Sequence, residues 1–167
     1  MQEQSEGVSG APFEYRALRS EEAGGEEGWY SWNLADQSRY NNAVLGDLLV
    51  RREENACRLR MRPERRHTNL GDNIHGGAML GLIDIGLFAT MHMLGDGKAG
   101  PSVTVELSTQ FVGAGDPALP LDAVTEIVCE TGRLIFVRGQ CVQVLQDGSE
   151  AVIASYSGIV RKMKPRR

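Results

Sequence analysis

The sequence predicts an α+β fold in which an antiparallel β-sheet wraps around one long central helix. The helix is indicated by about 17 mostly apolar residues, 78–94, which show no strict alternation and are too many for an ordinary strand. The sheet is indicated by several shorter stretches in which apolar and polar residues alternate, joined by short turns. Since only one long helix is available to cover this sheet, we expect the helix to be buried at its centre.

Composition and charge are those of a single globular domain. The chain has 167 residues, of which 41% are hydrophobic and 24% charged, enough for one sizeable core. Its net charge of -4 argues against a dedicated nucleic-acid-binding protein. Cys57, Cys129 and Cys141 lie far apart and form no C-x-x-C pair, which favours reduced thiols. The N-terminus lacks a basic region followed by an apolar run, so we expect no signal peptide and a cytoplasmic protein.

The ends of the chain differ in composition from its middle. Residues 1–28 are rich in Glu, Gly and Ser and poor in large apolar side chains, a composition typical of a disordered acidic arm. Trp29 and Trp32 mark the start of one domain, which we expect to run over residues 29–162 without an internal linker or repeat. Residues 163–167 form a basic tail, which we expect to be frayed.

Before the central helix the sequence predicts a short helix and a hairpin. Asp36 is a suitable cap for a short helix that runs to about Val44. Two strands follow, at residues 47–52 and 55–62, with a turn at 53–55. In the second strand three apolar residues alternate with three arginines, so we expect one face in the core and the other in water. The alternating residues are Cys57, Leu59 and Met61 on one face and Arg58, Arg60 and Arg62 on the other.

Four more strands are predicted after the central helix. A loop over residues 95–101 leads to the first of them, and turns that contain Gly, Asp or Pro separate the others. The expected strands cover residues 103–111, 121–129, 134–145 and 151–161. In the first strand, Val103, Val105, Leu107, Thr109 and Phe111 alternate with Thr104, Glu106, Ser108 and Gln110. Short connections between successive strands imply an antiparallel sheet.

The predicted central helix carries one unusual residue. We expect the helix to run from Gly76 to Leu94 and to end at Gly95, and Asp84 is its only formal charge. A buried carboxylate without a partner costs several kcal/mol, so its presence in an apolar helix indicates a functional role. The segment is long and apolar enough to suggest a membrane span, but Asp84 near its middle and the flanking strand patterns argue against one.

Motifs around this helix resemble those of a known family. Asn69 precedes His75-Gly76-Gly77 in an N-x5-H-G-G pattern, and Asp84 follows His75 by nine residues. Together with the buried helix and the antiparallel strands after it, this pattern resembles the hotdog-fold acyl-CoA thioesterases of the phenylacetate-pathway (PaaI-like) type. The resemblance covers roughly residues 44–162. It implies a hotdog fold and the hydrolysis of an aryl-CoA or medium-chain acyl-CoA thioester to free acid and CoA, with no cofactor.

The residues themselves suggest how a thioester would be cleaved. Backbone N–H groups at a helix start are unpaired and carry the positive end of the helix dipole, so the Gly76 N–H is the candidate oxyanion donor. Asp84 would act either as a general base on water or as a nucleophile that forms a mixed anhydride. The resemblance further implies that Asn69 positions the water or the carboxylate, and that Thr104 hydrogen-bonds the water or Asp84.

Other residues are assigned to substrate binding. The candidates beside the thioester are His75, Gly77 and Phe88, and the candidates for the phosphates of CoA are Arg133 and Lys162. Some relatives carry a Ser or Thr one helical turn after the acid, where this chain has Phe88. Thr104 would therefore have to supply the hydroxyl near Asp84.

Helix geometry predicts that the site is shared between two chains. Gly76 and Asp84 are eight residues apart, which at about 1.5 Å per residue separates them by roughly 12 Å along one helix. Because both cannot contact one carbonyl, we expect Gly76 and Asn69 of one chain to meet Asp84 and Thr104 of a second. A homodimer with two equivalent sites follows, and hotdog enzymes of this type are similar, often as dimers of dimers. Neither nucleic acid nor a membrane is expected as a partner.

Each of these residues also has a structural interpretation. Asp84 would serve as a carboxylate bonded to a neighbouring hydroxyl or backbone group, and His75 as a residue that fixes the start of the helix. Gly76 and Gly77 would permit close packing of helix and sheet. Asn69 is common in turns and caps.

Other functions also remain open on the sequence. A metal site built from His67, Asp72 and His75 lacks tight ligand spacing, so no metal is predicted. A hotdog hydratase acting on an enoyl thioester is one alternative function, although the spacing from His75-Gly76-Gly77 to Asp84 disfavours it. An acyl-CoA binding or sensing module without turnover is the other.

Overall fold

The computed structural model describes residues 13–96 and 100–163 of the chain. Within these ranges it contains one long helix, two short helical turns and nine strands. The helices are η1 (Asn41–Leu45, a π-helical turn), η2 (Arg65–His67, a 3-10 turn) and α1 (Gly76–Leu94). The strands are β1 (Phe13–Glu14), β2 (Tyr30–Ser31), β3 (Asn33–Leu34), β4 (Leu48–Arg52), β5 (Cys57–Met61), β6 (Ser102–Phe111), β7 (Leu121–Glu130), β8 (Leu134–Val144) and β9 (Glu150–Lys162).

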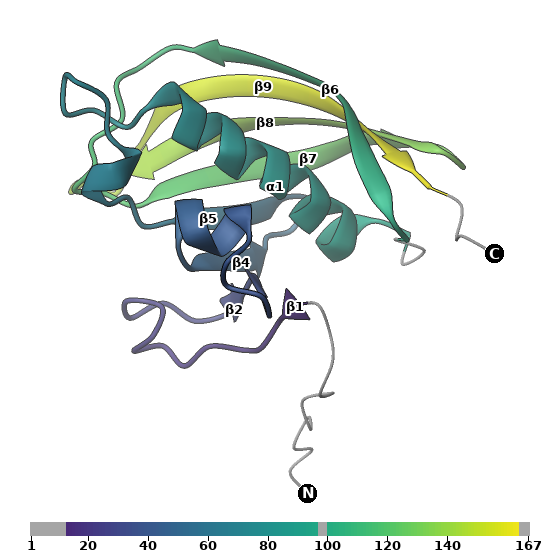
Figure 1. Ribbon diagram of the computed structural model, residues 1–167, viewed down its shortest axis with the longest axis horizontal. Helices are drawn as coiled ribbons and strands as arrows, with labels where there is room; N and C mark the ends of the chain where they lie inside the picture. The colour runs from purple at the N-terminus through teal and green to yellow at the C-terminus, as the bar shows by residue number, and fades with distance from the viewer. Residues whose placement is uncertain (1–12, 97–99, 164–167) are drawn as a thin grey trace, which may run out of the picture.

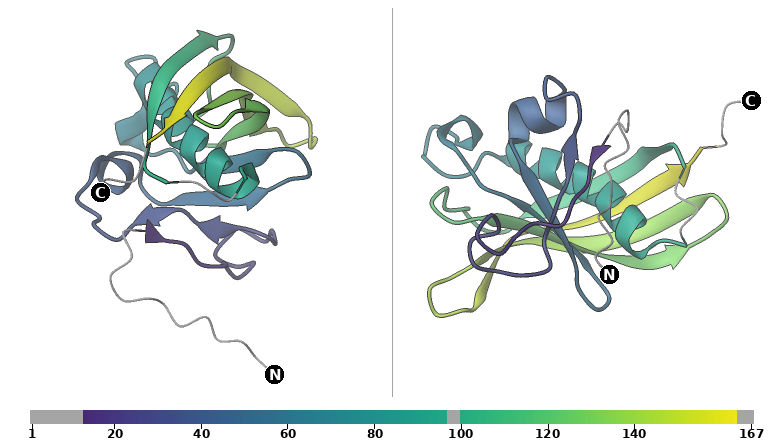
Figure 2. Two further views of the ribbon diagram at one scale, coloured as in Figure 1. Left: turned by 90° about the vertical axis from the view of Figure 1, so that its right-hand side faces the viewer. Right: turned by 90° about the horizontal axis from the view of Figure 1, so that it is seen from below.

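Seven strands form one antiparallel sheet that curves around α1 (Figure 1). Their order is β2-β4-β5-β7-β8-β9-β6, and β1 pairs separately with β3. Both further views show α1 lying along the inside of the curved sheet (Figure 2). The predicted α+β architecture, with one long helix at the centre of an antiparallel sheet, is therefore confirmed.

Helix α1 has the predicted bounds and is packed closely against the sheet. His75 caps its start, because Nδ1 accepts a hydrogen bond of 2.8 Å from the Gly77 N–H. Near its middle, Gly86 faces Ala123 of β7, and Leu87 meets Gly158 of β9. The absence of side chains at these glycines lets helix and sheet approach each other. The helix is also long and apolar enough to cross a membrane, but half of its most apolar stretch is buried inside this domain.

The predicted strands agree with the structure, whereas the predicted short helix is mostly a turn. Strands β4 to β9 each begin and end within two residues of the expected bounds. Asp36 does not cap a helix, because its Oδ1 accepts hydrogen bonds from the backbone N–H and hydroxyl of Ser38 in a local turn. Only η1 is helical, and Gly46 ends it with a φ of 76°, a conformation that glycine adopts without strain.

The N-terminal segment differs from the expected disordered arm. Residues 13–34, which we call the N-terminal strap, follow a defined path, and β2 pairs with the edge of β4. Trp29 is 1% exposed and packs with Ala23 and Leu49 in a second small core. The prediction from composition was wrong for these residues, because one large buried side chain can anchor a segment that is otherwise polar. The part of the predicted arm at residues 1–12, and the end of the predicted basic tail, lie outside the described residues.

The outer face of β5 is buried, although Arg58 and Arg60 were expected in water; Arg62, just after the strand, is exposed as predicted. Arg58 and Arg60 are both less than 10% exposed and bind Asp122 of β7, with N–O distances of 3.0 and 2.7 Å. The strap covers them, because Glu26 accepts a hydrogen bond from Arg60 and the Trp29 ring lies 4.4 Å from the Arg60 guanidinium. Buried charges are tolerated where they are paired in this way.

Acid should weaken the attachment of the strap. Burial opposes ionisation of Glu26, but hydrogen bonds from Arg60 and Trp29 outweigh it and hold the Glu26 pKa below its ordinary value. The stabilisation is therefore present above the unfolded carboxyl pKa of about 4.3 and is lost as pH falls through the lower folded value. We expect the free energy of unfolding, from urea titrations at pH 7 to 3, to fall less steeply with pH in Glu26→Gln than in the wild type. Equal slopes would contradict this account.

The three cysteines should differ sharply in reactivity. All are free thiols; Cys57 and Cys141 are buried, whereas Cys129 is exposed. Burial raises the pKa of Cys57 and of Cys141 to about 12, so neither forms a thiolate at neutral pH. In a titration with a chromogenic disulfide reagent we expect one fast thiol in the native protein and two more only after denaturation. The fast phase should disappear in Cys129→Ser.

Candidate active site

Asp84 lies on α1 within hydrogen-bonding distance of β6. The Thr104 hydroxyl donates to Asp84 Oδ1 over 2.6 Å, and both side chains are half-buried. Among the described residues, none donates a hydrogen bond to the second oxygen, Oδ2. Thr104 thus fixes one oxygen of the carboxylate and leaves the other available. The structure brings together these two predicted site residues.

A β-bulge in β6 turns Thr104 toward the helix. Strict alternation would place Thr104 and Leu107 on opposite faces of the strand. The pairing of β6 with β9 shifts between Thr104 and Glu106, so Val105 is an extra residue without a partner. Thr104 therefore shares the helix-facing side with Leu107, which packs against the core. Bulges often redirect a side chain next to an active site in this manner.

The start of α1 forms the second part of the candidate site. The Gly77 N–H is bonded to His75 Nδ1, so it is not available to a substrate. The Gly76 N–H donates to no described residue and remains at the positive end of the helix. His75 thus fixes the start of the helix and also lines the pocket there, and the Gly76 N–H is left without a described acceptor. The end of β6 also reaches this point, because a methyl group at Gly76 would lie 3.3 Å from the Phe111 ring.

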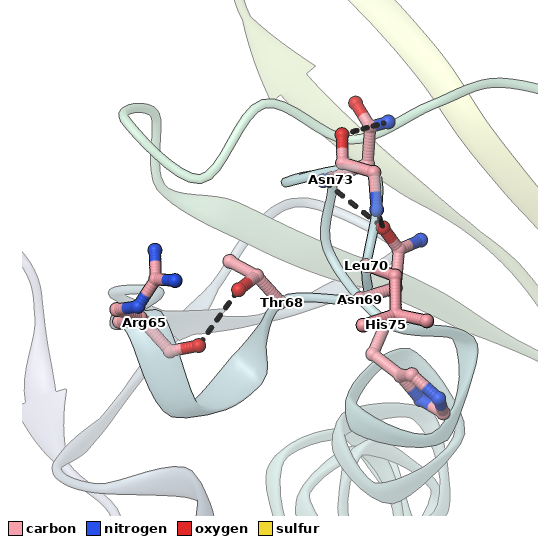
Figure 3. Close-up of a pocket in the computed structure, with 7 residues that line it drawn as sticks. Arg65, Thr68, Asn69, Leu70, Asn73 and His75 are labelled. Carbon is pink, nitrogen blue, oxygen red and sulfur yellow. Dashed lines mark hydrogen bonds between the residues drawn. The ribbon is translucent and has the colours of Figure 1, made fainter.

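Asn69 organises the loop that leads to this helix start. Its Oδ1 accepts hydrogen bonds from the backbone N–H groups of Gly71 (2.9 Å) and Asn73 (3.2 Å). Its amide nitrogen has no partner among the described residues, so it can still donate to a ligand. Figure 3 shows this loop beside the pocket and the His75 ring pointing toward α1. The pocket has a volume of about 750 Å³ and is lined by Arg65, Thr68, Asn69, Leu70, Gly71, Asn73 and His75.

The two parts of the candidate site do not meet within one chain. Asp84 does not line the pocket at the helix start. The eight residues between Gly76 and Asp84 correspond to roughly 12 Å of helix, and both residues lie on the same α1. The structure therefore pairs Asp84 with Thr104 and groups Asn69 with His75, but it leaves these two groups apart.

The basic residues predicted for CoA phosphates have different surroundings. Lys162 hydrogen-bonds Glu130 and lies 3.6 Å from Asp96, and the bond to Glu130 raises the pKa of Lys162. Two carboxylates thus already balance its charge. Arg133 is exposed in the turn between β7 and β8, and its side chain makes no ion pair with a described residue. Arg133 is the better placed of the two for an anionic ligand.

Two aromatic side chains near the site were not predicted from the sequence. Phe111 lies over Gly76, and Tyr40 lies over Gly81, where an added methyl group would be 2.7 Å from the Tyr40 hydroxyl. Phe88, one turn after Asp84, is half-buried and packs against the core. Glycine is unfavourable inside a helix, so Gly81 was the available signal that another group approaches the helix there.

Comparison with known proteins identifies the fold. Residues 71–145 match the family model of the thioesterase superfamily. The PaaI protein from the phenylacetic acid degradation operon of E. coli has 15% sequence identity and a TM-score of 0.63, over 77% of this chain and 87% of that one. Zebra fish thioesterase superfamily member 2 has 20% identity and a TM-score of 0.64, over 77% and 90% of the two chains.

A third solved structure gives the same result. A mutant of the phenylacetic acid degradation protein PaaI from Thermus thermophilus has 18% identity and a TM-score of 0.60, over 74% of this chain and 98% of that one. No curated protein matches the sequence. The chain thus has the hotdog fold, and the resemblance to PaaI-like thioesterases that its motifs indicated is confirmed.

Proposed function

We propose that this hotdog-fold chain, whose residues 71–145 match the thioesterase superfamily, is an acyl-CoA thioesterase. The superfamily match supports a thioester hydrolase in general. The observation that most supports the specific assignment is the Asp84 carboxylate, held at one oxygen by Thr104 and without a described partner at the other. A carboxylate arranged in this way can accept a proton or attack a carbonyl carbon.

Two courses of reaction fit this carboxylate. As a general base, Asp84 Oδ2 takes a proton from water while the water oxygen bonds to the thioester carbon. The oxyanion accepts the N–H of the partner's Gly76, the C–S bond breaks, and the CoA sulfur leaves and takes up the proton. As a nucleophile, Oδ2 itself bonds to that carbon and displaces the thiolate, and water then hydrolyses the mixed anhydride. Both courses consume one water and yield a free acid and CoA.

The open edge of β6 supports a homodimer that completes the site. Among the described strands, β6 pairs with β9 alone, and Val103 and Val105 are 40% and 56% exposed at this edge. Pairing β6 antiparallel with its copy reverses the strand direction across the interface. In each chain one end of β6 contacts Asp84 and the other end contacts Gly76. The reversal therefore brings the Gly76 end of one chain alongside the Asp84 end of the other.

We assign the CoA phosphates to Arg133 rather than to Lys162. The Arg133 carbonyl accepts the backbone N–H of Lys162 at the end of β9, and Lys162 pairs with Ser102 at the start of β6. Arg133 therefore lies at the same end of the sheet as Thr104. A guanidinium without a described carboxylate partner suits a phosphate group.

A panel of acyl-CoA substrates tests the proposed function. Release of free thiol from aryl and linear acyl-CoA thioesters by the purified protein is the expected result, with release abolished in Asp84→Ala. Binding without thiol release in both proteins would instead identify a sensing module. Addition of water to an enoyl thioester without thiol release would identify a hydratase.

The hydroxyl of Thr104 should matter more than any other hydroxyl on β6. Thr104→Val keeps the shape of the side chain but removes the hydrogen bond to Asp84, so we expect kcat to fall by about 10 to 100-fold. Thr109→Val is the matched control, because the Thr109 hydroxyl is buried and has no described partner. Removing an unsatisfied polar atom should leave thiol release unchanged and stability equal or higher. Equal activity in the two variants would contradict the role given to Thr104.

A further inference from the structure

One face of α1 is not fully buried against the sheet, although Asp84 on this face bonds to Thr104 of β6. At 3.6 residues per turn, Gly77, Gly81, Asp84 and Phe88 fall within about 60° of one another around the helix axis. None of these four residues is buried, whereas Leu82, Ile83, Gly86 and Leu87 on the sheet side are. Asp84 is thus accessible from this face. A thioester bound at Asp84 would therefore lie along this face of α1.

Tyr40 lies across this face one helical turn before Asp84. A methyl group at Gly81 would lie 2.7 Å from the Tyr40 hydroxyl and 3.4 Å from its ring, so the glycine supplies the space for the ring. Tyr40 is nevertheless 54% exposed, and its hydroxyl has no hydrogen-bond partner among the described residues. The ring is therefore held against the helix while one side of it remains open to a ligand.

Asp84 lies one helical turn after the glycine that Tyr40 covers. Helical side chains lean toward the N-terminus, so the Asp84 side chain leaves the helix on the side of the turn that contains Gly81, and its Oδ1 accepts the hydrogen bond from Thr104 of β6. Phe88, one turn later, packs against the core. A carbonyl carbon at Asp84 Oδ2 would thus have the Tyr40 ring about one helical turn away, toward the start of the helix.

We propose that Tyr40 is a specificity-determining residue, whose ring limits the size of the acyl group that lies beside Asp84. The inference rests on the proposed thioesterase function, which requires the first acyl carbons to lie within one helical turn of Asp84. Tyr40 precedes the segment 71–145 that matches the superfamily. The element that selects the acyl group therefore belongs to the N-terminal part of this chain, not to the segment that it shares with the superfamily.

Binding of non-hydrolysable S-alkyl thioethers of CoA by the full chain tests this inference. The probes are the S-butyl, S-hexyl and S-octyl thioethers, with dissociation constants from calorimetry. In Tyr40→Ala the space of the ring becomes available, so affinity for the S-octyl probe should rise about tenfold relative to the S-butyl probe. Tyr40→Phe, which keeps the ring, should follow the wild type. Val44→Ala is the matched control, since Val44 is an exposed side chain of η1, the turn that Tyr40 precedes.

The outcomes separate this inference from the proposed function. A shift in length preference in Tyr40→Ala alone supports the inference, even if the wild type releases no thiol from the matching thioesters and the proposed function fails. An equal change for every probe, or no change, overturns the inference even if the wild type hydrolyses the thioesters. Thermal unfolding of each variant checks that the fold is retained. We expect it to be, because Tyr40 lies outside the buried core.

Discussion

Asp84→Ala and Asp84→Asn should each lower kcat for acyl-CoA hydrolysis by about 10³-fold, within the range known for a positioned acid or base. Asparagine keeps the shape and can still bond to Thr104, but it neither accepts a proton from water nor attacks a carbonyl. The free energy of unfolding should be unchanged or higher, because Asp84 is a half-buried carboxylate whose described hydrogen-bond partner is one hydroxyl. Steady-state kinetics and urea unfolding of the same preparations check both statements.

A single-turnover reaction in ¹⁸O-labelled water tests whether Asp84 acts as the nucleophile. If it does and water attacks the aspartyl carbon of the mixed anhydride, the label enters Asp84, and peptide mass spectrometry detects it there. Label in the released acid alone is the result for a general base, and also for attack of water on the acyl carbon of the anhydride, so label on Asp84 is the result that identifies the nucleophile. Activity in Asp84→Asn close to that of the wild type would remove Asp84 from either role.

Two inactive variants should restore activity when they share a dimer. Gly76→Pro removes the candidate oxyanion N–H at the first position of α1, where proline is tolerated, and His75 before it already has an extended backbone. We expect a loss of about 10² to 10³-fold in kcat. Coexpression with Asp84→Ala gives heterodimers with one intact site, so random pairing should recover about a quarter of the wild-type activity.

A matched mixture controls this experiment. The double variant Gly76→Pro with Asp84→Ala, coexpressed with wild-type chains, also gives heterodimers in half of the particles. If the site is shared, these heterodimers contain no intact site. If each chain holds a complete site, they retain one, and the mixture of single variants stays inactive. A monomer in sedimentation experiments would likewise contradict a shared site.

The sequence predicted well those features that depend on neighbouring residues. The bounds of α1 followed from an apolar run between Gly76 and Gly95, because helix formation and termination are local. The hairpins of the sheet followed from alternation and turn residues for the same reason. The motif around His75 and Asp84 located both parts of the candidate site.

Contacts between distant segments were not predictable in this way. Alternation cannot reveal the bulge at Val105 that turns Thr104 toward Asp84, since an extra residue leaves no mark on composition. The burial of Arg58 and Arg60 depends on Asp122, more than 60 residues later, and on the strap that covers them. Tyr40 over Gly81 is a third case, because the two residues belong to different elements.

The two edge strands of the main sheet differ in whether a strand from another copy can pair with them. The short strand β2 occupies the border at β4, and the strap then covers the neighbouring outer surface, whereas no other strand of the described residues pairs with the outer side of β6. A sheet that was extendable at both borders would add copies without limit and form filaments. Because the edge at β4 is covered, two copies can pair only through their β6 edges. Once they have paired, neither copy has a second open edge, so this mode of assembly stops at a dimer.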